Sequence, residues 1–155
     1  MKRITNQIRD LQLIEDELRK TSVGVLALHL DDEKTFQLPT TFLYRDKNVY
    51  IFFNDETEFY ELIKYNSSAS FTIIKEEKAK KIRSLDFIPS YRMFSITING
   101  LVRKVEEEKT IQNLQTDYLS KYCKKSDSTI EDRSALSKAI IMDSDEIHAQ
   151  EEIGG

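Results

Sequence analysis

Three apolar segments that follow one another closely limit the fold more than any other feature of this sequence. Residues 23–30, 36–44 and 49–53 are rich in β-branched and aromatic side chains, and each has the length of one strand. Turn-forming residues at 31–32 and 45–48 separate them. Connections this short join antiparallel strands, because a parallel crossover needs a dozen or more residues. The sequence therefore predicts an antiparallel meander.

Three further strands are predicted at residues 68–74, 91–105 and 138–148. The second of these has the clearest alternation of apolar and polar positions. Its apolar face carries Phe94, Ile96, Ile98 and Val102. Gly100 falls on the same face, where a missing side chain either admits another backbone or a ligand, or marks a bulge.

Helices are predicted at residues 6–20, 55–65 and 107–122 from apolar residues spaced three or four apart. Pro39 interrupts the second strand of the meander, which places that strand at a sheet edge or at a bulge. Six strands with helices between them predict a small closed antiparallel barrel. One domain over residues 1–155 is expected from the length.

Composition narrows the functional classes. The chain has 23 Lys and Arg against 27 Asp and Glu, a net charge of −4, which argues against general nucleic-acid binding. A lone Cys123 excludes an intrachain disulfide and suits a reducing cytoplasm, and with only two His it argues against a Cys/His metal site. We find no signal-peptide pattern and no run near the roughly 18 apolar residues of a membrane helix, so a cytoplasmic location is expected.

The order of these segments resembles the FMN-binding split-barrel family, which includes pyridoxamine 5'-phosphate oxidase and the 5-nitroimidazole reductase-like proteins. The resemblance covers residues 7–108 and is closest to the latter branch. The segments that carry it are TSVGVLAL, PTTFLY, NVYIFF, KYNSSASFTII and YRMFSITINGLVRKVEE. It implies a mainly β fold with flanking helices, a six-stranded antiparallel split β-barrel that forms a homodimer with FMN at the dimer interface.

The resemblance also implies where the cofactor binds. The flavin ring is expected against the strand of Pro39, Thr40, Thr41 and Phe42, with Phe53 and Asn54 near the phosphate. A flavin needs an apolar wall together with backbone amides and hydroxyls for its polar edge, which the two threonines could supply. The alternative is that both are ordinary strand residues.

The phosphate end fits the family pattern poorly. Relatives place a Ser or Thr and an Arg/Lys pair where this chain has Phe53, Glu58 and Phe59. A carboxylate about 6 Å from a phosphate costs roughly 3 kcal/mol per unit charge at an effective dielectric near 20. Two other groups of cations could replace the pair, and the alternative for both is ordinary surface charge. The first, expected in a loop, is Lys75, Lys78, Lys80, Lys81 and Arg83, and the second is the turn residues Arg45 and Lys47.

Two functions from different classes follow. The first is a flavin-dependent oxidoreductase with an unknown substrate, in which the cofactor performs the chemistry and no catalytic side chain is assigned. The second is a non-enzymatic split-barrel dimer that binds another small molecule or no cofactor. Nucleic-acid binding through the basic segment is a weaker third hypothesis. His29 is expected as a satisfied core or interface histidine.

Overall fold

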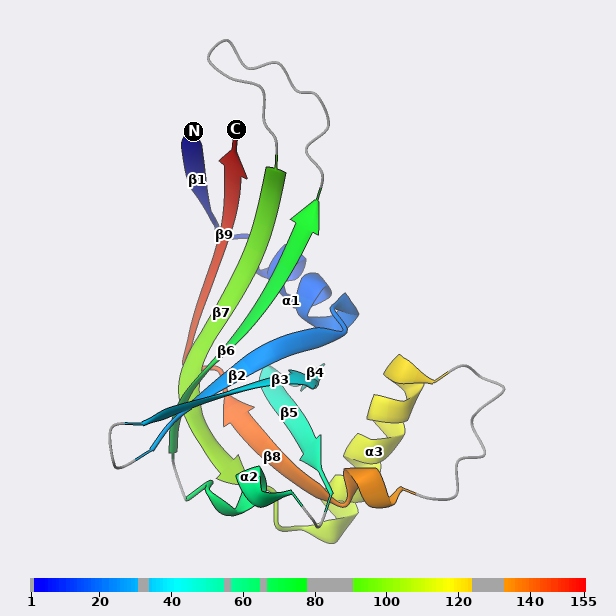
Figure 1. Cartoon of the computed structure of the whole chain (residues 1–155). Helices are drawn as coiled ribbons and strands as arrows, with labels where there is room; N and C mark the ends of the chain where they lie inside the picture. Colours follow the sequence, from blue (N-terminus) through cyan, green and yellow to red (C-terminus); the bar gives the residue numbers. More distant parts are fainter. Residues whose placement is uncertain (1, 31–33, 55–56, 65–66, 78–90, 124–132) are drawn as a thin grey trace.

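The computed structural model describes residues 2–30, 34–54, 57–64, 67–77, 91–123 and 133–155 (Figure 1). The strands are β1 (Arg3–Ile8), β2 (Val23–His29), β3 (Thr35–Thr41), β4 (Leu43–Arg45), β5 (Asn48–Phe53), β6 (Ser67–Glu77), β7 (Tyr91–Lys104), β8 (Lys138–Asp143) and β9 (Glu146–Gly154). The helices are α1 (Leu11–Lys20), α2 (Glu58–Glu61) and α3 (Glu108–Tyr122), with a 3-10 turn at Ser134–Leu136.

The described strands form one antiparallel sheet that curls on itself (Figure 1). Its main path runs β3-β2-β6-β7-β8-β5-β4, with β9 beside β7 and β1 beside β9. A single residue, Phe42, separates β3 from β4, so the two ends of the path are consecutive in the chain. This confirms the predicted mainly β, antiparallel split barrel with flanking helices. All six predicted strand segments are strands, and the sheet has nine because two of them are divided and β1 is added.

Gly100 lies where β7 exchanges one partner for another. Up to Asn99, β7 pairs with β9, and from Val102 onward it pairs with β8. The corner between β8 and β9 passes so close that a Cβ on Gly100 would lie 2.0 Å from the carbonyl oxygen of Asp143. Of the two alternatives that the sequence left open, this glycine therefore permits the close approach of another backbone segment.

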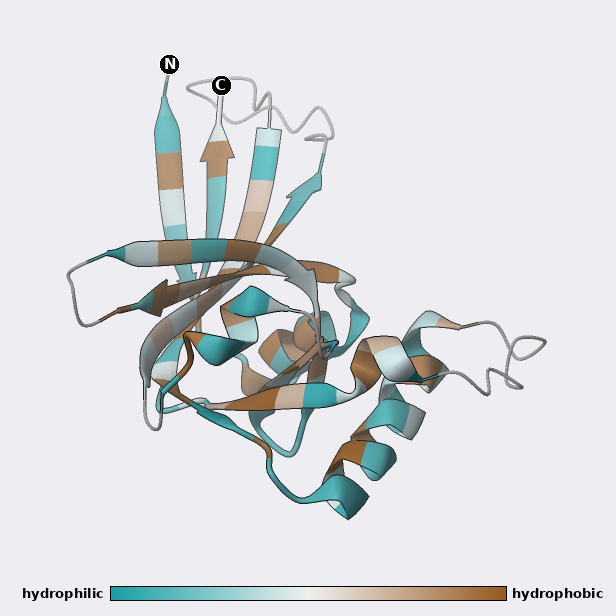
Figure 2. Cartoon of the chain, turned by 60° about the horizontal axis from the view of Figure 1, so that its bottom comes forward, coloured by the Kyte–Doolittle hydropathy of each residue, from teal (hydrophilic) through white to brown (hydrophobic). Residues whose placement is uncertain are grey.

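The core lies inside the curled sheet. Its largest fully buried side chains include Phe42, Phe71, Leu26, Ile98 and Met142. Phe42 packs edge-to-face on Phe71, with ring centroids 4.8 Å apart. Hydrophobic residues occupy the strands in the interior, whereas the outward surface of α3 is mostly hydrophilic (Figure 2). Within the described part of the chain, no helix is long and apolar enough to cross a bilayer.

The start of the first helix was wrong in the sequence prediction. Residues up to Ile8 form β1, which pairs with β9 from the far end of the chain, and the helix begins only at Leu11. Asp10 caps it, because its carboxylate accepts a hydrogen bond from the Leu13 N–H at 3.3 Å. Ile8 has helical spacing with Leu11, but pairing with a distant strand decides its conformation.

Two other local predictions need correction. Residues 138–148 form two strands, because the chain turns a corner between β8 and β9 at Ser144 and Asp145. His29 is exposed at the end of β2 rather than in the core, and its ring nitrogen lies 3.4 Å from the Thr35 hydroxyl.

Candidate functional site

The strand predicted to face the flavin, β3, is an edge strand. It pairs only with β2 along the main path, and Pro39 stands opposite Val25. Of the two alternatives that Pro39 left open, an edge or a bulge, the structure has the edge, where a strand can lack one ladder donor. Alternate backbone N–H and C=O groups on the outer side of β3 are therefore not used by the sheet.

Helix α3 contacts the end of this strand through two tyrosines. The Thr41 hydroxyl lies 2.8 Å from the phenol oxygen of Tyr118. The Phe42 N–H donates to the Tyr122 phenol oxygen at 3.1 Å, and that phenol lies 2.9 Å from the Phe42 carbonyl and 2.7 Å from the Ser22 carbonyl. Burial raises the pKa of Tyr122, so the phenol stays protonated and can donate to these carbonyls.

Lys121 completes this contact. Its ammonium donates to the Phe42 carbonyl at 3.0 Å and lies 4.0 Å from the centre of the Phe42 ring and 5.1 Å from that of Tyr122. Burial lowers its pKa from 10.5 to about 8. No ion pair joins Lys121 to a carboxylate of the described residues. We call Thr41, Phe42, Tyr118, Lys121 and Tyr122 the α3 cluster.

The predicted phosphate position is an aromatic corner. Phe53 is buried at the end of β5 and stacks on Phe59, with ring centroids 5.9 Å apart. Tyr60 lies at the same distance from Phe53, and Phe36 of β3 meets Phe59 edge-to-face at 6.2 Å. Phe36 is 41% exposed, so one side of the corner is open to solvent. We call Phe36, Phe53, Phe59 and Tyr60 the aromatic corner.

Charge around the aromatic corner does not favour an anion. Glu58 is exposed in the first turn of α2, and Glu61 ends the same short helix. The nearby cation, Lys104, lies 4.4 Å from the Tyr60 ring centre and 4.0 Å from the Glu61 carboxylate. The side chain of Asn54 accepts a hydrogen bond from the Thr57 hydroxyl at 2.5 Å, which closes the turn before α2.

Of the alternative cations, one is paired, one lies in a turn, one belongs to a strand and four lie outside the described residues. Arg45 forms an ion pair of 2.6 Å with Asp117 of α3. Lys47 occupies a left-handed position in the β4–β5 turn. Lys75 belongs to β6 rather than to a loop, which corrects the prediction, whereas Lys78, Lys80, Lys81 and Arg83 lie outside the described residues.

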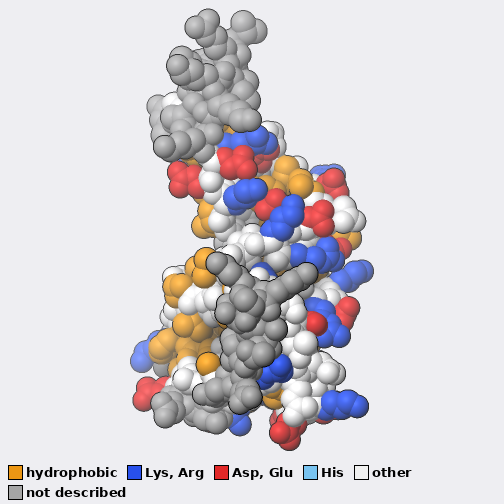
Figure 3. All heavy atoms as spheres, turned by 90° about the vertical axis from the view of Figure 1, so that its right-hand side faces the viewer, with side chains coloured by type: hydrophobic (Ala, Val, Ile, Leu, Met, Phe, Trp, Pro, Cys, Tyr) orange, Lys and Arg blue, Asp and Glu red, His pale blue; other side chains and the backbone are white. Residues whose placement is uncertain are grey.

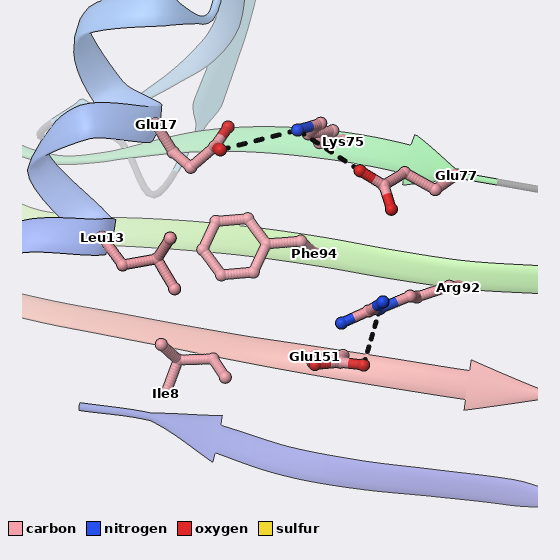
Figure 4. Close-up of a pocket in the computed structure, with 8 residues that line it drawn as sticks. All are labelled: Ile8, Leu13, Glu17, Lys75, Glu77, Arg92, Phe94 and Glu151. Atoms are coloured by element: carbon pink, nitrogen blue, oxygen red, sulfur yellow. Dashed lines mark hydrogen bonds and ion pairs between the residues drawn. The ribbon is translucent and has the colours of Figure 1, made fainter. Parts of the chain in front are cut away.

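Two pockets in the described part of the chain are well formed, and neither of these two includes the predicted cofactor residues. The first, of about 280 Å³, lies between α1 and strands β1, β6, β7 and β9 (Figure 4). It is lined by Ile8, Leu13, Glu17, Lys75, Glu77, Arg92, Phe94 and Glu151. Its cations are paired: Lys75 with Glu77 at 3.3 Å and Glu17 at 3.5 Å, and Arg92 with Glu151 at 2.7 Å.

The second pocket, of about 480 Å³, lies beside the N-terminus of α3. It is lined by Tyr50, Arg103, Lys104, Val105, Glu106, Glu107, Thr110 and Ile141. Two of these residues are cations and two are carboxylates, so the pocket has no clear preference for either sign of charge. On the face of the molecule toward α3, basic and acidic side chains are likewise mixed (Figure 3).

The structure brings the predicted residues into two groups at opposite ends of β3. Thr41 and Phe42 lie in the α3 cluster, whereas Phe53 and Phe59 lie in the aromatic corner. The sequence predicted the helix over residues 107–122, which carries Tyr118 and Tyr122, but it gave no role to Lys121. The available signal was the spacing of residues 118, 121 and 122, which puts a lysine on the same helical face as the two tyrosines.

Comparisons with known proteins agree with this fold. A family model described as pyridoxamine 5'-phosphate oxidase matches residues 10–150. No curated protein matches the chain. A crystal structure of a candidate 5-nitroimidazole antibiotic resistance protein from Bacteroides thetaiotaomicron is 15% identical, with a TM-score of 0.75 over 100% of this chain and 93% of that one.

Two further solved structures are similar. A FAD-binding protein from Mesorhizobium loti is 15% identical, with a TM-score of 0.69 over 96% of this chain and 98% of that one. A FAD-binding protein from Mycobacterium smegmatis is 13% identical, with a TM-score of 0.67 over 97% of this chain and 100% of that one. At these identities the likeness concerns the fold, whereas the family model spans most of the sequence. The chain therefore belongs to the pyridoxamine 5'-phosphate oxidase family.

Proposed function

We propose that this protein binds a flavin along the outer edge of β3 and serves as a flavin-dependent oxidoreductase of unknown substrate. Family membership supports the proposal, as do two similar structures named as FAD-binding proteins. The observation that carries it is the edge position of β3, whose outer backbone groups are not used by the sheet. A flavin ring needs such donors and acceptors for its polar edge and an apolar wall for its faces.

The residues of this chain fit the ring better than they fit a phosphate at the predicted position. Pro39 and Thr41 are exposed on β3 beside the half-buried Thr40, so this strand is accessible. By contrast, Phe53 is buried against Phe59, and neither side chain can donate a hydrogen bond to an anion. When bound, a flavin supplies hydride chemistry, and the protein orients it and shields it from water.

A homodimer belongs to the same proposal. Among the described strands, none pairs with the outer edge of β3, and a second copy of the chain would shield a flavin held there from solvent. Exposed apolar side chains on β2 and β3 support this, because Val23 is 57% exposed and Phe36 is 41% exposed. We further propose that residues 1–155 act as one split-barrel domain in a cytoplasmic protein.

A second candidate is a split-barrel dimer without a flavin. The aromatic corner and the contacts of α3 on Thr41 and Phe42 favour it, because they occupy groups that a cofactor would otherwise use. The two functions differ in a direct observation. Purified protein with visible flavin absorbance, which releases flavin on denaturation, supports the first function. Colourless protein that also fails to bind added micromolar riboflavin, FMN or FAD supports the second.

A further inference from the structure

We propose that this protein prefers a flavin without a phosphate, so that it binds riboflavin more tightly than FMN. This preference rests on the proposed function and is set by the aromatic corner, which stands where the family resemblance implies the phosphate-binding residues. Those positions carry Phe53, Glu58 and Phe59. In the structure they form packed aromatic surface beside carboxylates rather than an anion site.

The aromatic corner has few hydrogen-bond donors for a phosphate. Phenylalanine has no polar side-chain atom, and the rings of Phe53 and Phe59 stack on each other with centroids 5.9 Å apart. Of the four side chains of the corner, only Tyr60 carries a polar group. Helix α2 has four residues, too few for an N-terminus that could bind an anion through several aligned amides. A phosphate placed here would lose its hydration without compensation.

The carboxylates beside the corner add repulsion. Glu58 lies in the first turn of α2 and Glu61 ends the same helix, and both are exposed. Lys104 contacts the corner with its ammonium 4.4 Å from the Tyr60 ring centre, but that ammonium also lies 4.0 Å from the Glu61 carboxylate. A phosphate monoester carries a charge of about −1.5 to −2, so carboxylates repel it. Riboflavin is uncharged and does not meet this repulsion.

Two other groups report the same electrostatic surroundings. Burial raises the pKa of Tyr60, and the carboxylates of Glu61 and Glu106 raise it further, because they disfavour a second negative charge beside them. Lys138 stands opposite Phe53 in the sheet and already has another partner. A phosphate at the corner would therefore meet carboxylates, and the two lysines near it are both engaged.

The corner offers apolar contact instead. Phe36 is 41% exposed and meets Phe59 edge-to-face at 6.2 Å, so aromatic surface is open to solvent. Leu62, directly after α2, is 38% exposed. Such surface is stabilised when uncharged ligand groups cover it, and it cannot replace the hydration of a phosphate. The residues that disfavour FMN therefore still admit riboflavin.

The test measures the affinities of flavin-free full-length protein for riboflavin and FMN, which differ only in the phosphate, from the change in flavin fluorescence on binding. We expect riboflavin to bind about twofold to tenfold more tightly than FMN. Raising the salt from about 0.05 to 0.5 M should narrow this difference, because salt screens the repulsion. A phosphate held by cations would behave in the opposite way, since salt would then weaken FMN binding relative to riboflavin binding.

Variants of an exposed residue test the cause without disturbing the core. Glu58→Lys should tighten FMN binding at least about threefold and leave riboflavin binding unchanged. Glu58→Gln removes the repulsion without adding a cation and should tighten FMN binding about twofold. The matched control is Asp16→Lys, which makes the same change of charge on α1 and should keep the ratio of the two affinities as in wild type.

The outcomes separate this preference from flavin binding itself. Tighter binding of FMN than of riboflavin by wild type would overturn the preference and leave flavin binding intact. An unchanged ratio of the two affinities in Glu58→Lys would overturn it as well, because the carboxylate would then have no influence on the phosphate. Failure of riboflavin, FMN and FAD to bind at all would instead reject the proposed function.

Discussion

Replacing Lys121 by methionine should change how the stability of the flavin-free protein depends on pH. The pKa of this ammonium is about 8 in the folded protein and 10.5 in its ordinary state, because burial disfavours the charge. Below pH 8 both states are protonated, and the folded state bears the full cost of the buried charge. Between about pH 8 and 10.5 the folded state releases its proton first, so the free energy of unfolding of wild type rises with pH.

The magnitude follows from this pKa. The whole difference between 10.5 and about 8 corresponds to about 3 kcal/mol, which would be recovered only above pH 10.5. Between about pH 7 and 9.5, the lowered pKa without any screening would raise the free energy of unfolding by about 2 kcal/mol. Screening by solvent reduces this rise toward about 0.5 kcal/mol. We therefore expect the free energy of unfolding of wild type to rise by about 0.5–2 kcal/mol more than that of Lys121→Met over this interval. The lost hydrogen bond to the Phe42 carbonyl shifts the variant by about 1 kcal/mol at every pH and does not alter the slope.

Urea denaturation at several pH values measures this difference, with both proteins unfolded at each pH. The interval stays below the ordinary pKa of tyrosine, about 10, so ionisation of the phenols contributes little. Lys109→Met serves as the control and should follow wild type in parallel. Parallel curves for wild type and Lys121→Met would refute the reasoning, because they would show that the ammonium is as well solvated in the folded protein as in the unfolded chain.

Three further predictions concern the barrel. Phe42→Ala should cost about 3–5 kcal/mol in urea denaturation because the side chain is fully buried, whereas Ile74→Ala, at a residue 59% exposed, should stay within about 0.5 kcal/mol of wild type. Gly100→Ala should lower the free energy of unfolding by about 1–3 kcal/mol, since its methyl group would meet the Asp143 carbonyl; an unchanged melting temperature would contradict the close approach. Burial raises the pKa of Tyr44 to about 12, so wild type should lose stability from about pH 10 to 12 and Tyr44→Phe should lose less; equal losses would count against a buried phenol.

The barrel could be predicted from the sequence because its strands carry local signals. Alternation in residues 91–105 and the short turns between the early strands determine an antiparallel order without reference to distant contacts. Gly100 and Pro39 were informative for the same reason, since each restricts what the backbone can do at its own position. β1 could not be predicted, because its residues are mostly polar and exposed and its conformation depends on pairing with β9.

Of the candidate site, only the residues at the end of β3 could be predicted. Thr41 and Phe42 were identified through the family resemblance, but their neighbours come from α3, almost eighty residues later in the chain. Nothing local in the sequence states which helix packs on which strand end. Lys121 reads as one of many surface cations until its ammonium is seen against the Phe42 carbonyl and ring.

The two ends of β3 also show why counting charges is a poor guide to this family's ligand site. The chain carries more acidic than basic residues, and two cations of the site region are paired, Arg45 with Asp117 and Lys104 in part with Glu61. A paired cation offers little net field to a ligand, because its partner's charge cancels it at a distance. Lys121 differs because its described polar contact is the neutral Phe42 carbonyl, so no described carboxylate cancels its charge. The local field near β3 therefore depends on which cations are paired more than on the overall charge of the surface.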